Sequence, residues 1–311
     1  MDVFKRRTNL DFMGWRRPAA AVSVVLVVLS LACVIVRGLN FTIDFTGGTL
    51  VELAFDRKVD PGDVRRLLAD SGYRGASVQH YGSATGVLVR LPNPDKAGTG
   101  LGDAIVTTLE KGIDGRIEVR RIDFVGPQVG DELTEQGGLA VLISLAAILV
   151  YIGFRFEWRF AVGAVIALIH DVFITLGFFS LFWFDFDLVV FAAVLTVIGY
   201  SLNDTIVVFD RVRENFRAMR KRTPVQIFNA SLNQTLSRTL MTSLTTLLVL
   251  IALFFLGGEL IHEFATALIV GIVIGTYSSI YVAGTMALAL GVIKSDLLVV
   301  PKEGDGADAR P

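Results

Sequence analysis

Six long apolar segments constrain this 311-residue chain more than any other feature of its sequence. Each approaches the roughly 20 residues that a helix needs to cross a hydrocarbon core of about 30 Å. Because lipid offers no hydrogen-bond partners to the backbone, each segment is predicted to be a helix. The fold class expected is therefore a polytopic α-helical membrane protein with six transmembrane helices. The predicted spans are residues 18–37, 139–156, 160–182, 188–209, 238–256 and 264–293.

Positive charge falls in alternate connections between the spans. The short connections in between carry Asp185, Asp187, Glu259 and Glu263, without Lys or Arg. Basic loops tend to stay in the cytoplasm, so both termini are predicted to be cytoplasmic. The basic residues that carry this argument are Lys5, Arg6, Arg7, Arg16, Arg17, Arg155, Arg159, Arg211, Arg213, Arg217, Arg220, Lys221 and Arg222.

This orientation predicts five parts of the chain. They are a cytoplasmic arm at 1–17, the first span at 18–37, an extracytoplasmic domain at 38–136, spans two to six within 137–293 with a cytoplasmic loop at 211–237, and a disordered cytoplasmic tail at 294–311. The first span is predicted to be an uncleaved anchor, because its apolar run is too long for a signal peptide. The single cysteine, Cys33, excludes disulfides within the chain.

The segment 38–136 is polar enough to form a soluble α+β domain. Strand-like alternation at 49–55 is followed by a helix that opens at Asp60 and Pro61, two strands near 76–81 and 86–91, a helix near 101–111 and a strand at 116–124. This β-α-β-β-α-β order predicts a ferredoxin-like domain. The paired glycines after Asp44, Gly47 and Gly48, allow a tight turn where the first span meets the domain, and we interpret them as a hinge.

Asp204 is a carboxylate inside the fourth apolar segment. An Asp near the centre of a membrane helix costs about 2.5–3.5 kcal/mol, so such residues usually face a protein interior and mark ion or proton pathways. Tyr200 shares its helix face and Asn203 flanks it. Arg238, at the start of the fifth segment, is expected at a similar depth on the neighbouring helix.

Two interpretations of Asp204 and Arg238 stay open from the residues alone. The pair can be static and only fix how the helices pack. Alternatively, protonation of Asp204 releases Arg238 to other partners, and each proton that crosses resets the local geometry. A proton falling through ~100 mV releases about 2.3 kcal/mol, enough to bias a two-state arrangement of helices.

Other polar and small residues lie inside the spans. His170 and Asp171 are adjacent in the third span, where they can relay a proton or only form hydrogen bonds between helices. In the sixth span, Gly271 and Gly275 form a G-x-x-x-G face that Ser278 and Ser279 extend. Small residues of this kind let helices approach closely, so this face is predicted to serve helix packing.

The sequence does not favour an enzyme. Ser201 with His170, and Asp171 with Asp204, lack the flanking residues of intramembrane serine and aspartyl proteases. The histidines His80, His170 and His262 have no zinc-ligand spacing. No nucleotide-binding loop is found, and no cofactor is expected.

Five motifs together resemble the SecF family of bacterial protein-export membrane proteins. They are Asp44-Phe-Thr-Gly-Gly48, Leu168-Ile-His-Asp171, the stretch from Gly199 to Asn215, Ser237-Arg-Thr239 and Gly275-Thr-Tyr-Ser-Ser279. The resemblance covers nearly the whole chain. This family belongs to the resistance-nodulation-division superfamily, and the resemblance places its transmembrane acid and arginine on Asp204 and Arg238.

The resemblance implies an accessory subunit of the Sec protein translocase in the bacterial inner membrane. Such a subunit is expected to form a heterodimer with SecD, to associate with the SecYEG channel and the translocating preprotein, and to use the proton motive force; YajC is a further candidate partner. The alternatives are a half-transporter of the same superfamily for small molecules or lipids, and a passive scaffold. The short later external loops favour the Sec interpretation.

Overall fold

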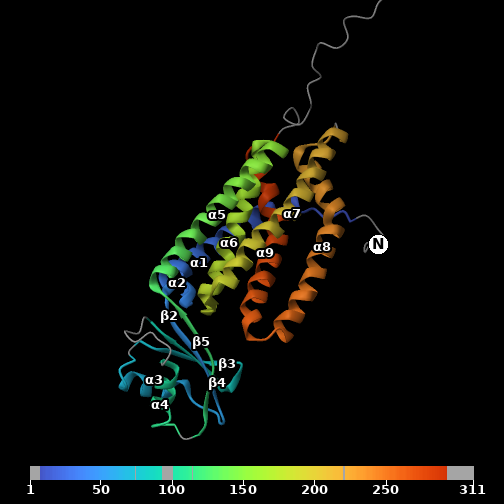
Figure 1. Ribbon diagram of the computed structural model, residues 1–311. Coiled ribbons are helices and arrows are strands. Elements are labelled where there is room, and N and C mark those ends of the chain that lie inside the picture. The colour runs from blue at the N-terminus through green and yellow to red at the C-terminus, as the bar shows by residue number, and fades with distance from the viewer. Residues whose placement is uncertain (1–7, 74, 93–100, 114, 220, 293–311) are drawn as a thin grey trace, which may run out of the picture.

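The computed structural model describes residues 8–73, 75–92, 101–113, 115–219 and 221–292. Lys5, Arg6, Arg7 and Arg220, the predicted end of the sixth span at residue 293 and the predicted tail at 294–311 lie outside these residues. A bundle of long helices forms one part of the molecule, and a small domain with a sheet lies at one end of it (Figure 1).

Six helices are long and apolar enough to cross a membrane, which confirms the predicted number of spans. They are α1 (Arg16–Arg37), α5 (Pro127–Arg155), α6 (Trp158–Phe182), α7 (Leu188–Ala218), α8 (Pro224–Leu256) and α9 (Glu259–Ala289), and a 3-10 turn, η1 (Met13–Trp15), precedes α1. The protein is therefore a multi-pass membrane protein.

Several helices continue beyond the apolar segments that predicted them. The helix α5 begins at Pro127, α7 continues to Ala218, and α8 begins at Pro224 instead of at Arg238. A capping box between Thr223 and Gln226 starts α8, because each side chain accepts a hydrogen bond from the other residue's backbone N–H. Residues 224–237 of the predicted cytoplasmic loop are thus helical and form one element with the fifth span. Helical hydrogen bonds are satisfied within the segment, so a helix need not end where its apolar stretch ends.

The helices α6, α7 and α9 form the centre of the bundle. In the most apolar window of each, 50%, 44% and 61% of the residues are buried, against 6% in α1 and in α5. Phenylalanines fill the core near the ends of α6, α7 and α8, where Phe160 packs against Phe209 and Phe228. The carboxylates of Asp171 on α6 and Asp204 on α7 are therefore buried within protein, whereas the outer faces of α1, α5 and α8 are uncovered in the single chain.

The domain outside the bundle has the predicted β-α-β-β-α-β order. Its elements are β2 (Gly48–Phe55), α3 (Pro61–Asp70), β3 (Ser77–Tyr81), β4 (Ser83–Leu91), α4 (Leu101–Leu109) and β5 (Ile117–Val125). The strands form an antiparallel sheet in the order β3-β4-β2-β5. Val51 and Leu53 of β2 pack into the core with Leu68 of α3 and Ile105 of α4, so both helices cover one face of the sheet.

The other face of the sheet looks toward the membrane bundle. A cleft of about 590 Å³ lies there, between Leu50 and Glu52 of the sheet and Asp185, Asp187 and Glu263 of the bundle. A short helix, α2 (Ile43–Thr46), and a parallel pairing of β1 (Asn40–Phe41) with β6 (Asp185–Phe186) bring the start of the domain against the α6–α7 loop. The sequence did not predict this pairing, because strands of two residues carry no readable alternation.

Candidate functional site

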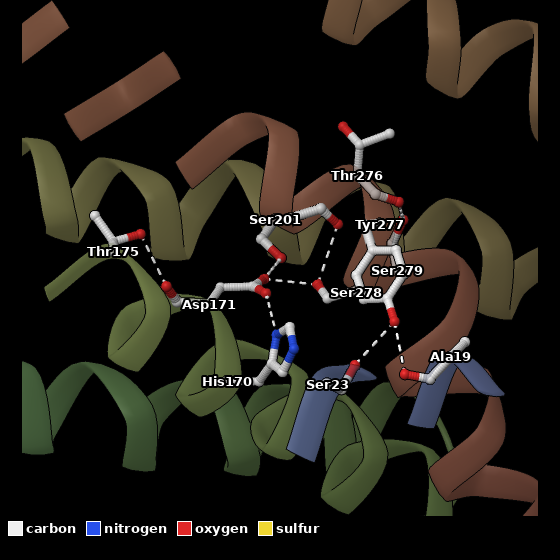
Figure 2. A network of polar contacts seen from close by, with 11 residues as sticks. Ala19, Ser23, His170, Asp171, Thr175, Ser201, Thr276, Tyr277, Ser278 and Ser279 are labelled. Carbon is white, nitrogen blue, oxygen red and sulfur yellow. Dashed lines mark hydrogen bonds and ion pairs between the residues drawn. The ribbon is translucent and has the colours of Figure 1, made fainter. Parts of the chain in front are cut away.

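The carboxylate of Asp171 is the centre of a buried network that joins the three central helices (Figure 2). Its Oδ2 accepts the hydroxyl of Ser201 from α7 at 2.5 Å and that of Ser278 from α9 at 2.7 Å. Its Oδ1 lies 2.9 Å from Nδ1 of His170, the preceding residue on α6. Three hydrogen bonds thus satisfy a carboxylate that is 0% exposed.

The network continues from α6 toward α1. The ring of His170 stacks on Tyr277 of α9 with a centroid distance of 6.2 Å. The Tyr277 hydroxyl donates to the carbonyl of Ala19 at 2.8 Å and lies 3.0 Å from the Ser23 hydroxyl, both on α1 (Figure 2). Polar contacts therefore cross the bundle from α7 through α6 and α9 to α1.

Asp204 lies on α7, three residues after Ser201, and is 3% exposed. Its Oδ2 has no hydrogen-bond partner among the described residues. Two side chains of α8, Arg238 and Ser243, act electrostatically on its carboxyl group. Ser243 in turn lies 2.7 Å from the hydroxyl of Thr276 on α9. Asp204 thus faces α8, whereas Ser201 faces α6.

Arg238 does not contact Asp204. No ion pair within 4.0 Å joins the two residues in the part of the chain that the structure describes. Arg238 is exposed and lines a cavity of about 910 Å³ at the end of the bundle away from the sheet domain, between α5, α7 and α8. The pairing suggested by their expected depth is therefore an interaction at a distance, because the Arg238 side chain turns to this cavity.

We call this whole cavity the basic vestibule, and its lining is strongly charged. Its lining contains Arg155, Asp210, Arg211, Arg213, Glu214, Arg217, Gln234 and Arg238. Arg155 pairs with Asp210 at 2.9 Å, and Arg211 pairs with Glu214 at 2.5 Å. The amide oxygen of Gln234 accepts from Nε of Arg211 at 2.6 Å. An open, charged cavity of this size can hold water between the α7–α8 connection and Arg238.

The other two candidates on α7 lie at different positions. The hydroxyl of Tyr200 lies 3.4 Å from that of Thr246 on α8, so it faces the same helix as Asp204. Asn203 is exposed on the surface of the single chain. The structure brings Tyr200 and Asp204 to the α8 side and leaves Asn203 outside this group.

The small residues of α9 lie where this helix meets α7. A Cβ atom built on Gly271 would lie 2.1 Å from Cγ2 of Val197, and one on Gly275 would lie 3.0 Å from Cβ of Ser201. Ser278 belongs to the Asp171 network, whereas the buried Ser279 donates to the carbonyl of Thr276 at 3.0 Å. Ser278 thus both packs and donates a hydrogen bond to a charged group, which its spacing alone did not reveal.

The residues interpreted as a hinge lie between α1 and the sheet domain. Gly47 and Gly48 both have positive φ, at 67° and 129°, and a Cβ on Gly48 would lie 2.5 Å from the carbonyl oxygen of Leu91. Asp44 accepts a hydrogen bond from the N–H of Leu188 at the start of α7, at 3.1 Å. This turn therefore requires glycine and is tied to the helix that carries Asp204.

Sequence reasoning missed several residues of these contacts. Ser23, Ser243 and Thr276 were not singled out, because serine and threonine are common in membrane helices and give no signal by themselves. Thr276 and Tyr277 lie inside the Gly275–Ser279 motif, in which only Gly275, Ser278 and Ser279 were assigned a role. Within the described residues, no three His, Cys, Asp or Glu side chains gather into a group that could hold a metal ion.

Six membrane helices, an α+β domain beyond the end of the bundle and two buried carboxylates within the helices define a polytopic α-helical membrane protein. A family model described as "Protein export membrane protein SecD/SecF, C-terminal" matches residues 105–292, and one described as "SecD/SecF GG Motif" matches residues 34–59. The chain belongs to the SecD/SecF family of protein export membrane proteins.

Relatives match along nearly the whole chain. The protein translocase subunit SecF of Vibrio alginolyticus is 52% identical over 98% of each chain, and that of Pseudomonas aeruginosa is 48% identical over 97% of this chain and 98% of the relative. The crystal structure of SecDF, a translocon-associated membrane protein from Thermus thermophilus, is 39% identical and aligns with a TM-score of 0.83 over 93% of this chain. The chain spans only 39% of that SecDF chain.

Proposed function

We propose that this chain is an accessory subunit of the Sec protein translocase that works with SecD and uses the proton motive force to promote late-stage protein translocation. The observation that carries the proposal is the 52% identity to a protein translocase subunit SecF over 98% of both chains. The role is one of transport and not of enzymatic catalysis. The protein would lie in the bacterial cytoplasmic membrane, with both termini in the cytoplasm.

A SecD subunit is the first partner proposed. The SecDF chain of known structure is more than twice as long as this one, and the remaining part would correspond to SecD. The outer face of α8 supports a partner there, because Leu244, Leu248 and Val249 are each more than half exposed in the single chain. SecYEG and the translocating preprotein are further proposed partners, and YajC is an additional candidate.

Asp204 and Arg238 are the proposed proton-coupling residues. Asp204 is buried, with one carboxylate oxygen that has no partner among the described residues, and Arg238 lines the basic vestibule. When Asp204 is ionised, Arg238 is attracted toward it; when Asp204 is protonated, Arg238 is released toward Asp210 and Glu214 in the vestibule. A proton crossing ~100 mV supplies about 2.3 kcal/mol for such a rearrangement.

The remaining candidates have supporting roles in this proposal. Tyr200 and the His170–Asp171 pair extend the polar region around Asp204, and Asn203 would face the partner subunit. Gly271, Gly275, Ser278 and Ser279 hold α9 close to α7. Asp44, Gly47 and Gly48 would transmit a change in α7 to the extracytoplasmic domain, because Asp44 bonds to the first residue of that helix.

A half-transporter for small molecules or lipids is the less favoured alternative. Among the described residues, the connection from α6 to α7 outside the membrane is only 183–187, and that from α8 to α9 is 257–258. These connections leave no room for a second external domain in this chain. In the described part of the chain, the domain between α1 and α5 is therefore the only one that would contact an exported substrate outside the membrane.

The test is preprotein translocation into membrane vesicles that contain the chain together with SecD and SecYEG. Wild type, Asp204→Asn, Arg238→Met and the control Asp70→Asn, which makes the same change on exposed α3, are compared with and without a proton gradient. We expect the gradient to stimulate wild type and the control but neither transmembrane variant, at equal protein amounts. If the gradient still stimulates translocation in Asp204→Asn, Asp204 is not the coupling site. If the gradient does not stimulate wild type, the proposed function is wrong.

A further inference from the structure

Asp171 is a second intramembrane carboxylate, and no Arg or Lys of the described residues pairs with it. Within the described residues, its only ion-pair neighbour within 4.0 Å is His170, at 2.9 Å. A buried charge without a strong cation is costly, and such residues are retained in membranes where function requires them. A neutral acceptor could also accept the hydroxyls of Ser201 and Ser278. Both hydroxyls instead donate to the Asp171 carboxylate.

The bond to Ser201 is the connection from Asp171 to the helix that carries Asp204. Ser201 and Asp204 are three residues apart on α7. This separation is about 4.5 Å along the helix axis, slightly less than one full turn. At 2.5 Å, the Ser201 contact is also the shortest of the three that Asp171 makes. A change in the Asp171 carboxylate therefore reaches Asp204 through less than one turn of helix.

Packing at Ser201 limits how the helix can respond. Gly275 of α9 lies against it so closely that an added Cβ would be 3.0 Å from the Ser201 Cβ. Asp204, which lies about 60° from Ser201 around α7, faces Ser243 of α8, which is itself bonded to Thr276 of α9. Because α9 packs this closely against Ser201, α7 cannot shift toward α9, whereas it can still rotate about its own axis. The Ser201–Asp171 bond opposes this rotation.

We propose that Asp171 is a positioning residue for Asp204: by accepting the Ser201 hydroxyl, it fixes the rotation of α7 that presents the Asp204 carboxyl to Arg238 and Ser243. This inference rests on the proposed function, since Asp204 must be the proton-coupling residue for its position to matter. Ser278 holds the same carboxylate oxygen but belongs to α9, so its bond fixes α9 and not the helix of Asp204.

The groups that face this network are few among the described residues. From α6 and α9 come the titratable side chains of His170 and Tyr277, and from α7 comes Asp204. The helix α1 contributes the neutral hydroxyl of Ser23, and α8 contributes the charged Arg238 through its action on Asp204. A change in the position of Asp204 relative to these groups is therefore expected to change the pH profile of transport.

The experiment compares Ser201→Ala, Asp171→Asn and their double variant with Ser278→Ala as the matched control. Each is assembled with SecD and SecYEG in vesicles, and gradient-dependent translocation is measured from pH 5.5 to 8.5 at equal protein amounts. We expect Ser201→Ala and Asp171→Asn to shift the midpoint of the profile by about half a pH unit or more. The double variant should shift no further than the larger single shift, because both changes break one link. Ser278→Ala should keep the wild-type midpoint.

The outcomes separate this inference from the proposed function. If Asp204→Asn abolishes gradient stimulation while Ser201→Ala and Asp171→Asn keep the wild-type midpoint, the positioning role is overturned and the proposed function stands. If Ser278→Ala shifts the midpoint as far as Ser201→Ala, the network acts through general packing and the positioning role is again overturned. If Asp204→Asn keeps its stimulation, the proposed coupling site itself fails.

Discussion

At the residue scale, acidic side chains outside the membrane gather where α7 begins. Asp187 caps this helix, because its Oδ1 accepts the N–H of Val190 at 2.7 Å. Burial raises the pKa of Asp187; the Val190 N–H opposes this shift, and the nearby carboxylates of Asp44 and Asp185 add to it. The ionised form of Asp187 is therefore less favourable in the folded protein than in the unfolded chain.

The raised pKa of Asp187 predicts that the folded protein gains stability as the pH falls. Because the folded-state pKa is raised, ionised Asp187 lowers stability at neutral pH, and the loss is recovered as the pH falls toward the ordinary Asp pKa of about 3.9. Asp187→Asn keeps an N-cap acceptor without the charge. We expect it to raise the melting temperature in detergent at pH 8, with a smaller difference from wild type at pH 4.5.

Asp187→Ala is the control for this prediction. It removes both the charge and the cap, and loss of an N-cap costs about 1 kcal/mol. An Asp187→Asn variant that melts below wild type at pH 8 would show that the charge at this cap stabilises the helix after all.

At the element scale, close packing of α7 against α9 holds the centre of the bundle. The two helices approach at Gly271, where an added Cβ would overlap the branched side chain of Val197. Valine has no flexible end that could move aside, so the helices themselves would have to separate. The same two helices hold Ser201 and Ser278 against Asp171.

This packing predicts that Gly271→Ala destabilises the protein by about 1–3 kcal/mol, the usual cost of overpacking a core. The measurement is the melting temperature of the purified protein in detergent. Gly138→Ala, on α5 with no heavy atom within 4 Å of the added Cβ, is the matched control and should be nearly neutral. Adding Val197→Ala to Gly271→Ala should recover part of the loss; no recovery would place the strain elsewhere.

At the scale of the whole molecule, one carboxylate joins the external domain to the membrane bundle. Asp185, in the α6–α7 loop, forms an ion pair with Arg90 of β4 and accepts hydrogen bonds from Gln79 of β3 at 3.2 Å and Asn40 of β1 at 2.7 Å. The side chains of Arg90 and Asp185 are only 11% and 19% exposed. The contact is therefore shielded from solvent and holds the sheet over the cleft.

Breaking this contact should loosen the domain. In a Cys33→Ser background, spin labels on Asp70 of α3 and Leu181 of α6, both exposed, would report the distance between domain and bundle. We expect Arg90→Met to broaden the distance distribution relative to the unaltered chain, because Asp185 loses its cation. Arg66→Met, which removes an exposed ion pair within α3, should leave the distribution unchanged. An unchanged distribution in Arg90→Met would show that β1–β6 pairing and packing suffice.

Much of this architecture was predictable from local sequence. Six spans follow from the length of apolar segments, and the order of strands and helices in the external domain follows from alternation and capping signals such as Asp60 and Pro61. These properties depend on neighbouring residues, whose periodicity fixes the type of element. Asp204 could be found for the same reason, since a charge in an apolar segment is conspicuous wherever the helix lies.

Only the tertiary structure decided which polar residues meet. Ser201 and Ser278 lie 30 and 107 residues from Asp171, and both reach one carboxylate oxygen. Arg238, expected to pair with Asp204, instead lines the basic vestibule. The sequence determined the elements and the presence of charge within them, because helix formation and its cost in lipid are local. The rotation of each helix about its axis depends on the packing of distant segments, and that rotation determines each side chain's neighbours.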